Sequence, residues 1–474
     1  MRAVGLVVGV LALVANVCYN LEHRAEAWGG QSALAGAWEG TIDVSGVSLR
    51  MRVVFTESGD GLAAAIDIPQ QGASGLPLRE VSLTGSTVHF ELPTGAAAAV
   101  FEGELSGATI AGTFTQGPAV GTFSLTRAAE VVPQPPPPYR EEDVTFSSGA
   151  VTLAGTLTMP DTGGPFPAVV LLTGSGAQTR DEEIFGFRVF RELADHLTRH
   201  GIAVLRYDDR GVGGSTGNIA QSTSDDFAGD ALAAMAFLRA RADIRGTQVG
   251  LLGHSEGAAV AAIAATAPSG APAFIVMLAG PGVSGDRVTR QQVTDGARMM
   301  GATDEQVAEI VEAHRRMTEL TANGASREEM TGAVRALMRA QLEGRPAAQV
   351  AAIGDIDAFI EARLDAEVTR VMTPWWRHFV SFDPATALAR VTCPVLVVFG
   401  GKDVQVPPSQ HREPVEAALS KNGRVKVVEY PTANHLFQEA ITGQVAEYRV
   451  LEKAFVAGLL DELTGWVLEV TADR

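Results

Sequence analysis

Residues 249–265 read VGLLGHSEGAAVAAIAA and contain the pentapeptide Gly253-His254-Ser255-Glu256-Gly257. An apolar run, Val249–Leu252, precedes this G-x-S-x-G pattern, and an alanine-rich stretch, Ala258–Ala265, follows it. A strand, a sharp turn and a helix in that order lift one serine hydroxyl out of the fold, where a histidine can deprotonate it. The stretch therefore predicts an α/β fold that presents Ser255 as a nucleophile.

The chain contains a second G-x-S-x-G copy, Gly213-Gly214-Ser215-Thr216-Gly217. Composition alone supplies roughly 0.3 such matches in a chain of this length, so the flanking sequence has to decide. The second copy follows Asp208-Asp209-Arg210 and precedes the mostly polar residues 218–222. Because no strand pattern precedes it and no helix pattern follows it, we predict that this copy is a loop.

Length and charge restrict the class of protein. The 474 residues are too many for one ordinary core and indicate two domains or one domain with a large insertion. The net charge of −18 repels phosphate backbones and anionic lipid, so we expect no nucleic-acid partner.

The N-terminus has the order of a secretory signal peptide at residues 1–27. Arg2 precedes an apolar run at residues 3–17, which is shorter than a membrane span, and an Ala25-x-Ala27 site follows polar residues. This pattern predicts a periplasmic or secreted protein with no stable membrane partner after cleavage. The alternative is an uncleaved helix that anchors the chain in the membrane.

Residues 32–127 alternate in hydrophobicity with a period of two and carry turn residues every eight to twelve positions, which favours a small all-β sandwich or barrel. A proline-rich linker at 128–140 follows, because consecutive prolines fit neither a sheet ladder nor a helix interior. Nothing catalytic is visible in the β-domain, and a cell-envelope ligand is a possible partner for it.

Residues 141–474 alternate apolar runs with helical patterns after a hairpin at 144–159. Such runs predict a mostly parallel sheet covered on both faces, with a site at the carboxyl ends of its strands. The runs are 168–172, 203–207, 249–252, 274–278, 395–399 and 425–428.

Residues from about 283 to 382 show only helical signals and predict a helical cap inserted into the sheet domain. Thr303-x-x-Gln306 and Ser326-x-x-Glu329 are capping boxes ahead of apolar stripes. Residues 374–379, PWWRHF, bring aromatic side chains back toward the sheet, either as a wall of an acyl pocket or as core.

A serine nucleophile needs a histidine base and a carboxylate that orients it, in the chain order Ser, Asp or Glu, His. Asp403 fits the acid because it follows the apolar run 395–399. Only His411 and His435 come later, and His411 begins a predicted helix, so we expect His435 to be the base.

The developing oxyanion needs two backbone N–H donors. One is the residue after the nucleophile, Glu256, and the other comes from the loop Thr173–Gly176. The Ser175 amide is favoured, with Gly176 as the alternative. No cofactor and no metal are expected, because no complete dinucleotide, phosphate-loop or zinc pattern is present.

Together these residues resemble the secreted bacterial α/β-hydrolases of the EstD-like esterase group, which are related to the serine aminopeptidase S33 and dienelactone hydrolase branches. The resemblance implies an α/β-hydrolase fold with Ser255, Asp403 and His435 as triad and a carboxylesterase acting on short to medium acyl esters of small molecules. It is carried by Leu171–Gly176, Asp209–Gly213, Gly253–Gly257, Asp403 and Asn434-His435, and by Gly36–Gly40, Gln71–Gly75 and Thr126-Arg127 in the β-domain.

Two other functions stay open from the sequence. A serine aminopeptidase or amidase would use the same triad, and it would need an acid in the pocket to hold a substrate amino group. An envelope-binding protein with a vestigial hydrolase domain is the other alternative, although the complete set of catalytic residue types argues against an inactive domain.

Overall fold

The structure is a computed structural model that describes residues 33–44, 47–58, 61–68, 73–93, 98–117, 119–128 and 137–472. The chain divides into two compact units, Met1–Pro135 and Pro136–Arg474. The predicted signal peptide and residues 129–136 of the predicted linker lie outside the described residues, so export stays a prediction. In the part of the chain that is described, no helix has the length and hydropathy to cross a membrane.

The N-terminal unit is one antiparallel sheet that curls into a nearly closed barrel, with strand order β4-β3-β2-β1-β9-β8-β7-β6-β5. The two edge strands of this order, β4 and β5, are separated in the chain by Leu78 alone, so the two edges of the sheet lie close together. The Leu78 N–H extends the β3–β4 ladder with a bond to the carbonyl of Ala64 at 2.8 Å. The all-β prediction is confirmed in its barrel form. The strands are β1 (Gly36–Val44), β2 (Val47–Ser58), β3 (Gly61–Ile68), β4 (Ala73–Pro77), β5 (Arg79–Thr84), β6 (Thr87–Leu92), β7 (Ala99–Ser106), β8 (Thr109–Gln116) and β9 (Ala119–Arg127).

Aromatic side chains fill the barrel interior. Phe90 stacks on Phe101 with ring centroids 4.7 Å apart and meets Phe55 and Phe123 edge to face, at 5.7 Å from each. All four rings are essentially without solvent exposure, as is Trp38. The filled interior leaves the outer surface as the place for the envelope ligand that remains predicted for this unit.

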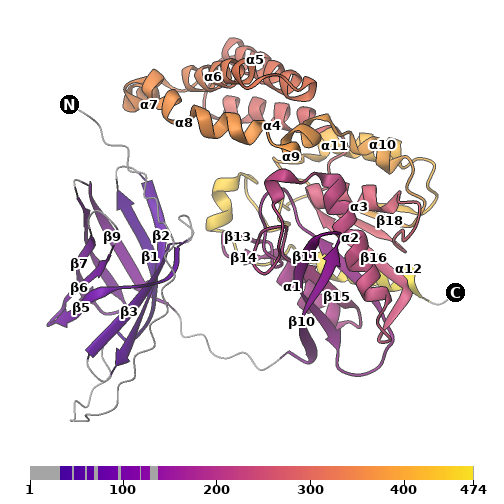
Figure 1. Ribbon diagram of the computed structural model, residues 1–474, viewed down its shortest axis with the longest axis horizontal. Coiled ribbons are helices and arrows are strands. Elements are labelled where there is room, and N and C mark those ends of the chain that lie inside the picture. The colour runs from indigo at the N-terminus through magenta and orange to yellow at the C-terminus, as the bar shows by residue number, and fades with distance from the viewer. Residues whose placement is uncertain are drawn as a thin grey trace. The chain divides into compact units, whose positions relative to one another are not determined.

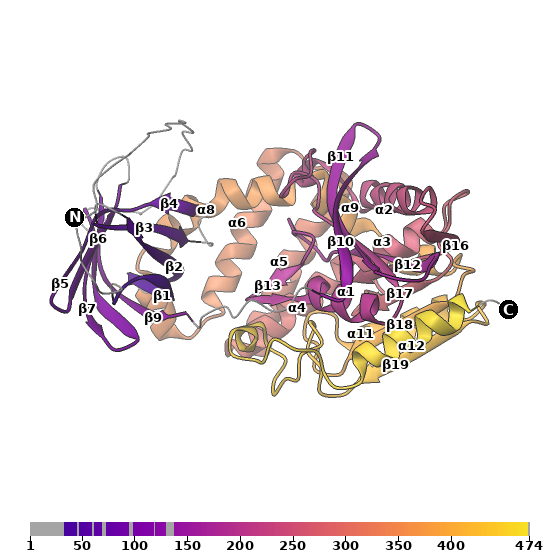
Figure 2. The same ribbon diagram turned by 90° about the horizontal axis from the view of Figure 1, so that it is seen from below.

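The C-terminal unit is built on an eight-stranded sheet with the order β10-β11-β15-β12-β16-β17-β18-β19 (Figures 1 and 2). The first two strands form the predicted antiparallel hairpin, and the pairs from β15 to β19 are parallel. The α/β-hydrolase prediction is confirmed. The strands are β10 (Tyr139–Ser148), β11 (Val151–Pro160), β12 (Phe166–Leu172), β15 (Ala203–Tyr207), β16 (Ile244–His254), β17 (Ile275–Leu278), β18 (Val395–Gly400) and β19 (Val425–Tyr430).

Helices cover both faces of this sheet. In β12, Val170 packs in the apolar cluster with α2, α3 and α11, whereas its neighbours Val169 and Leu171 pack in the cluster with α1 and α12. Because both faces are buried, the strand sequences are continuous apolar runs. These helices and the short elements of the loops are α1 (Val189–Arg199), α2 (Ser224–Arg239), α3 (Glu256–Ala265), α11 (Pro408–Ala418), α12 (Leu459–Thr471), β13 (Glu183–Ile184), β14 (Phe187–Arg188), η2 (Ile219–Gln221) and η3 (Val445–Arg449).

A set of helices is inserted between β17 and β18 and has its own apolar core. Both predicted capping boxes are confirmed, at Thr303 with Gln306 and at Ser326 with Glu329. In Figure 1, α5 and α6 form the layer far from the sheet, and α9 lies closer to it. The helices are α4 (Gly285–Met299), α5 (Asp304–Asn323), α6 (Arg327–Glu343), α7 (Ala347–Ile353), α8 (Ile356–Val371), α9 (Pro374–Ser381) and α10 (Pro384–Leu388).

The barrel core predicts the effect of a truncated ring. Phe90→Ala removes a ring that three others contact, and we expect the barrel to lose about 3–5 kcal/mol of unfolding free energy. Hydrogen exchange followed by mass spectrometry would show faster exchange in β6 and β7 and unchanged exchange in β16 and β17. Val120→Ala is the control, because Val120 is 66% exposed. Equal protection of β6 and β7 in both variants would contradict this assignment of the core.

Candidate active site

Ser255 occupies the turn between β16 and α3 with backbone angles φ 53° and ψ −120°. A residue other than glycine at positive φ is strained, and the surrounding structure has to hold it there. Part of that hold is a hydrogen bond from the Ser255 N–H to the carbonyl of Leu278, at the end of β17, at 2.8 Å. The serine therefore stands at the carboxyl edge of the sheet, where the sequence places the site.

The two glycines of the pentapeptide are required because backbones approach each other closely. A Cβ on Gly253 would lie 2.0 Å from the carbonyl oxygen of Gly257, and a Cβ on Gly257 would lie 2.1 Å from the carbonyl oxygen of Leu172. No side chain fits at such distances, so the turn admits only hydrogen at both positions.

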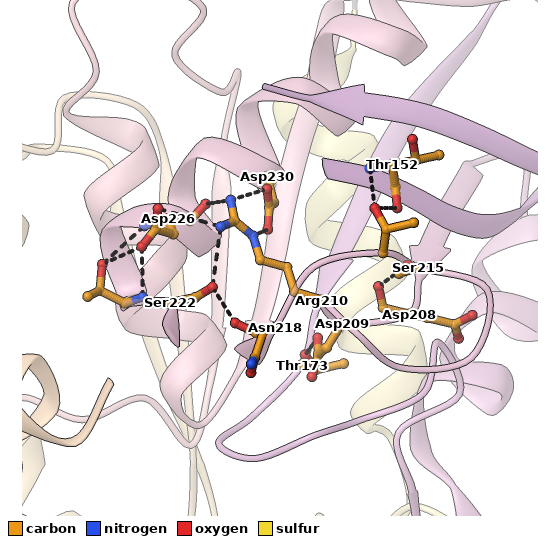
Figure 3. Close-up of polar contacts among 12 residues, drawn as sticks. Thr152, Thr173, Asp208, Asp209, Arg210, Ser215, Asn218, Ser222, Asp226 and Asp230 are labelled. Carbon is orange, nitrogen blue, oxygen red and sulfur yellow. Dashed lines mark hydrogen bonds and ion pairs between the residues drawn. The ribbon is translucent and has the colours of Figure 1, made fainter. Parts of the chain in front are cut away.

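The second G-x-S-x-G copy is a loop, as predicted, and its serine is a structural residue (Figure 3). Ser215 is buried, and its hydroxyl donates to the carbonyl of Asp208 at 2.7 Å. The same oxygen accepts the N–H of Ala154 in β11 at 2.9 Å. With both roles of the hydroxyl in use, Ser215 has no free proton to transfer.

His435 and Asp403 are brought together from two loops. His435 Nδ1 lies 2.7 Å from Asp403 Oδ2, and the other carboxylate oxygen accepts the N–H groups of Gln405 and Val406 at 2.7 and 2.9 Å. Burial by itself raises the pKa of Asp403, but His435 and these hydrogen bonds outweigh it and lower the pKa below its usual value. With Nδ1 bonded to the carboxylate, Nε2 is the ring nitrogen left to accept a proton.

His411, the other histidine after Asp403, has a different environment. It is fully buried in α11, and its Nδ1 accepts the N–H of Gly282 at 3.0 Å. Burial lowers the pKa of His411 to about 4. This ring is therefore a packed side chain and a weak base.

One cavity of about 410 Å³ brings Ser255 and His435 together with Ser175 and Glu256. Asp403 lies behind His435 and is 3% exposed. Three aromatic residues of α9 form part of the wall, Trp375, Trp376 and Phe379. Of these, Trp376 also packs in the core of the cap, so both roles that the sequence allows for this segment occur.

The loop after β12 and the first turn of α3 supply backbone N–H groups beside Ser255. The N–H groups in the first turn of a helix have no acceptor inside the helix, and Glu256 is the first residue of α3. In the loop, Ser175 lines the cavity of Ser255, whereas Gly176 lines a separate cavity of about 20 Å³ with Asp209 and Arg210. The placement favours Ser175 over Gly176 as the second donor.

Three carboxylates, the buried Glu182 and Glu256 and the half-buried Asp209, surround this loop, and each accepts a hydrogen bond from it. Glu182 takes the N–H of Gly174 at 2.7 Å, and Asp209 takes the Thr173 hydroxyl at 2.7 Å and the Gln178 N–H at 2.8 Å. Glu256 is bonded by the Ser175 side chain. Burial raises the pKa of Glu256, and it raises the pKa of Asp209 to about 7.

The Glu256 side chain also joins the sheet domain to the cap. Its carboxylate accepts the Ser224 hydroxyl at 2.7 Å and the Trp375 indole N–H at 3.0 and 3.1 Å. The sequence indicates a role only for the Glu256 backbone and leaves its side chain undetermined. The carboxylate fixes Trp375, and hence one wall of the cavity, relative to the turn that carries Ser255.

Arg210 anchors the loop that carries Asp209 (Figure 3). Its guanidinium makes two hydrogen bonds to Asp230 in α2, at 2.7 and 2.8 Å, and a longer one to the Ser222 hydroxyl at 3.3 Å. On the other side of the same loop, Asp208 pairs with Arg180 at 2.7 Å. These ion pairs hold Asp209 against the loop after β12.

Sequence reasoning missed two residues of the site, His254 and Glu182. Both line the cavity, and His254 Nδ1 lies 2.9 Å from Glu182 Oε1. The position of His254 inside the pentapeptide was a usable signal, because the residue before the nucleophile ends the strand at the site. Nothing around Glu182 in the sequence marks it.

Over the described residues, no group of three or more His, Cys, Asp or Glu side chains is arranged to hold a metal ion. Cys393, the one cysteine in this part of the chain, is a free thiol, and burial raises its pKa to about 11.

Sequence comparison finds a family match in the part of the chain that forms this cavity. A sequence profile described as "Alpha/beta hydrolase family" matches residues 169–447, which include Ser255, Asp403 and His435. The esterase EstD of Thermotoga maritima is 25% identical over 335 residues, which cover 70% of this chain and 69% of that protein. An esterase structure from Pyrococcus furiosus is 16% identical, with a TM-score of 0.43, and covers 72% of this chain and 95% of its own. A dienelactone hydrolase from Anabaena variabilis is 17% identical, with a TM-score of 0.37 and coverages of 70% and 98%.

The raised pKa of Asp209 predicts a pH dependence of stability. Between an ordinary aspartate pKa of about 3.9 and the folded value of about 7, the folded protein binds more protons than the unfolded chain. Unfolding free energy contributed by Asp209 therefore falls as pH rises through this window. Asp209→Asn removes the titration, so we expect the melting temperature of the variant relative to wild type to rise from pH 5 to pH 8. Asp161→Asn, at an exposed site, is the control, and parallel curves for Asp209→Asn and wild type would contradict the prediction.

Proposed function

The chain belongs to the alpha/beta hydrolase family, and we propose that it cleaves carboxylic esters of short to medium acyl chains through an acyl-enzyme on Ser255. The observation that carries the proposal is that Ser255, His435, Ser175 and Glu256 all line one cavity. The bond between His435 and Asp403 at 2.7 Å supplies the oriented base that a serine hydroxyl requires.

The proposed reaction uses each of these groups in turn. His435 Nε2 accepts the Ser255 proton while Oγ attacks the ester carbonyl, and the backbone N–H groups of Ser175 and Glu256 bind the oxyanion. Protonated His435 then donates that proton to the departing alkoxide, which leaves as an alcohol. A water molecule, deprotonated by His435, attacks the acyl-enzyme. When the bond between the acyl carbon and the Ser255 oxygen breaks, His435 returns that proton to Ser255 Oγ, and the carboxylic acid leaves. Asp403 stays ionised and stabilises the imidazolium.

The shape of the cavity supports the acyl range. Its volume of about 410 Å³ lies near the lower end of the roughly 300–1,000 Å³ of small-molecule pockets. Trp375 and Phe379 stack with ring centroids 5.3 Å apart and form a flat apolar wall. Such a wall suits an unbranched acyl chain and limits its length.

The aminopeptidase alternative needs an exposed acid for the substrate ammonium. The two acids that line the cavity are both buried: Glu182 is 0% exposed, and Glu256 already accepts donors from Ser224 and Trp375. The environments of these acids therefore favour an ester over an aminoacyl substrate.

The role of Ser255 is tested by Ser255→Ala. We expect the kcat/KM for p-nitrophenyl butyrate to fall about 10,000-fold and labelling by a fluorophosphonate probe to disappear, because the nucleophile is removed. Ser215→Ala is the matched control from the second G-x-S-x-G copy, and it should keep the labelling. The proposed function would be refuted if the wild-type protein neither hydrolysed any p-nitrophenyl ester from the acetate to the hexanoate nor reacted with the probe.

The role of Trp375 is tested with an acyl-chain series from acetate to decanoate. Trp375→Ala opens the wall, and we expect the ratio of kcat/KM for decanoate over butyrate to rise about tenfold. Trp375→Phe is the control, since it keeps a ring in the wall but loses the hydrogen bond to Glu256. A loss of activity caused by the missing bond to Glu256 affects both substrates equally and cancels in the ratio, whereas a longer pocket changes the ratio. An unchanged ratio in Trp375→Ala would contradict this role of Trp375.

A further inference from the structure

Glu182 and His254 form a buried pair beneath the nucleophile. His254 is the last residue of β16 and is 2% exposed, and Glu182 is 0% exposed with a positive φ of 45°. Glu182 Oε1 lies 2.7 Å from the Gly174 amide nitrogen and 2.9 Å from His254 Nδ1. On its other side, His254 Nε2 lies 2.9 Å from the backbone oxygen of His435. One continuous chain of hydrogen bonds thus runs from the loop Thr173–Gly176, here called the oxyanion loop, to the loop that carries His435, here called the His435 loop.

The partners of the pair determine how many protons it holds. The His435 oxygen is a peptide carbonyl and can only accept, so His254 Nε2 carries a proton. A second proton lies between His254 Nδ1 and Glu182 Oε1, whichever atom holds it, because two bare acceptors repel at 2.9 Å. With these two protons the pair is neutral overall. Neutrality is what a site without solvent contact requires, since an isolated buried charge is costly.

The two ends of this chain are the groups whose positions decide the proposed reaction. Gly174 precedes Ser175, whose amide is the proposed oxyanion donor, and the His435 peptide carries the base. Glu182 and His254 are 72 residues apart, and His254 and His435 are 181 apart, so no local structure aligns the two loops. The second oxygen of Glu182 has no partner among the described residues, so only Oε1 makes the connection.

Resting on the proposed function, we propose that Glu182 and His254 act as one positioning unit that holds the oxyanion loop and the His435 loop in register around Ser255. Neither side chain touches the reacting atoms in this role. A displacement of about 1 Å at a reacting group costs on the order of 100-fold in rate, so a tie between the loops has a kinetic effect. The charged and titratable groups that face the pair are Asp209 on the side of Glu182, and Asp403 and His435 on the side of His254. The Asp403 carboxylate favours the protonated His254.

Three variants cut the chain of bonds at different points. His254→Asn places an amide near Nδ1 and loses the bond to His435, His254→Gln places it near Nε2 and loses the bond to Glu182, and Glu182→Gln removes the shared proton. We expect each to lower kcat for p-nitrophenyl butyrate about 30-fold to 100-fold with KM changed less than threefold, since only transition-state geometry is affected. The double variant Glu182→Gln with His254→Gln should be no slower than the slower single variant.

His314→Gln is the matched control, because His314 is a buried histidine in α5 with no bond to either loop. It should keep kcat within twofold. If the wild-type protein is active and the three single variants keep kcat within threefold of wild type, the positioning unit is overturned. It is also overturned if the double variant lowers kcat by the product of the factors of the two single variants. Inactive wild-type protein would instead refute the proposed function.

A measurement independent of turnover tests the proton count. In protein labelled with ¹⁵N-histidine, we expect the His254 Nε2–H resonance to be present and in slow exchange with water from pH 6 to 8, and to disappear in His254→Asn. The His314→Gln variant should keep this resonance. A His254 Nε2 without a proton would overturn the hydrogen-bond chain whatever the activity of the protein.

Discussion

The close approach of α3 to β12 and β16 is the constraint on which the rest of the site depends. Because the backbones meet at the distances that exclude any Cβ at Gly253 and Gly257, Ser255 is forced to positive φ and its side chain leaves the packed interior. The same approach sets the first turn of α3 beside the loop after β12. One steric condition therefore positions both Ser255, the proposed nucleophile, and the backbone N–H groups proposed to bind the oxyanion.

A second feature is the concentration of acids around the loop that carries a proposed oxyanion donor. Glu182, Asp209 and Glu256 all accept donors from the loop after β12. Each carboxylate accepts a hydrogen bond from a donor of the loop that would otherwise be left without a partner, and each thereby holds the loop in one conformation. Burial raises the pKa of both Asp209 and Glu256.

The sequence predicted the fold well, because the fold depends on periodicity. Apolar runs of β-branched residues indicated the parallel strands, and capping boxes at Thr303 and Ser326 indicated the helices of the cap. Alternation in the N-terminal unit indicated an all-β domain but did not distinguish a sandwich from a barrel. That choice depends on how the edge strands β4 and β5 come together through Leu78, which a period of two does not encode.

For the site, the sequence by itself determined which residue types follow each strand and in what order, and this was enough to nominate Ser255, Asp403 and His435. Only the tertiary structure decided what surrounds them: that Glu256 fixes Trp375, that Asp209 accepts the Thr173 hydroxyl, and that Glu182 and His254 join two loops. The physical reason is that strand ends and turns are written in local patterns, whereas a hydrogen bond between side chains 72 or 181 residues apart exists only after the chain has folded.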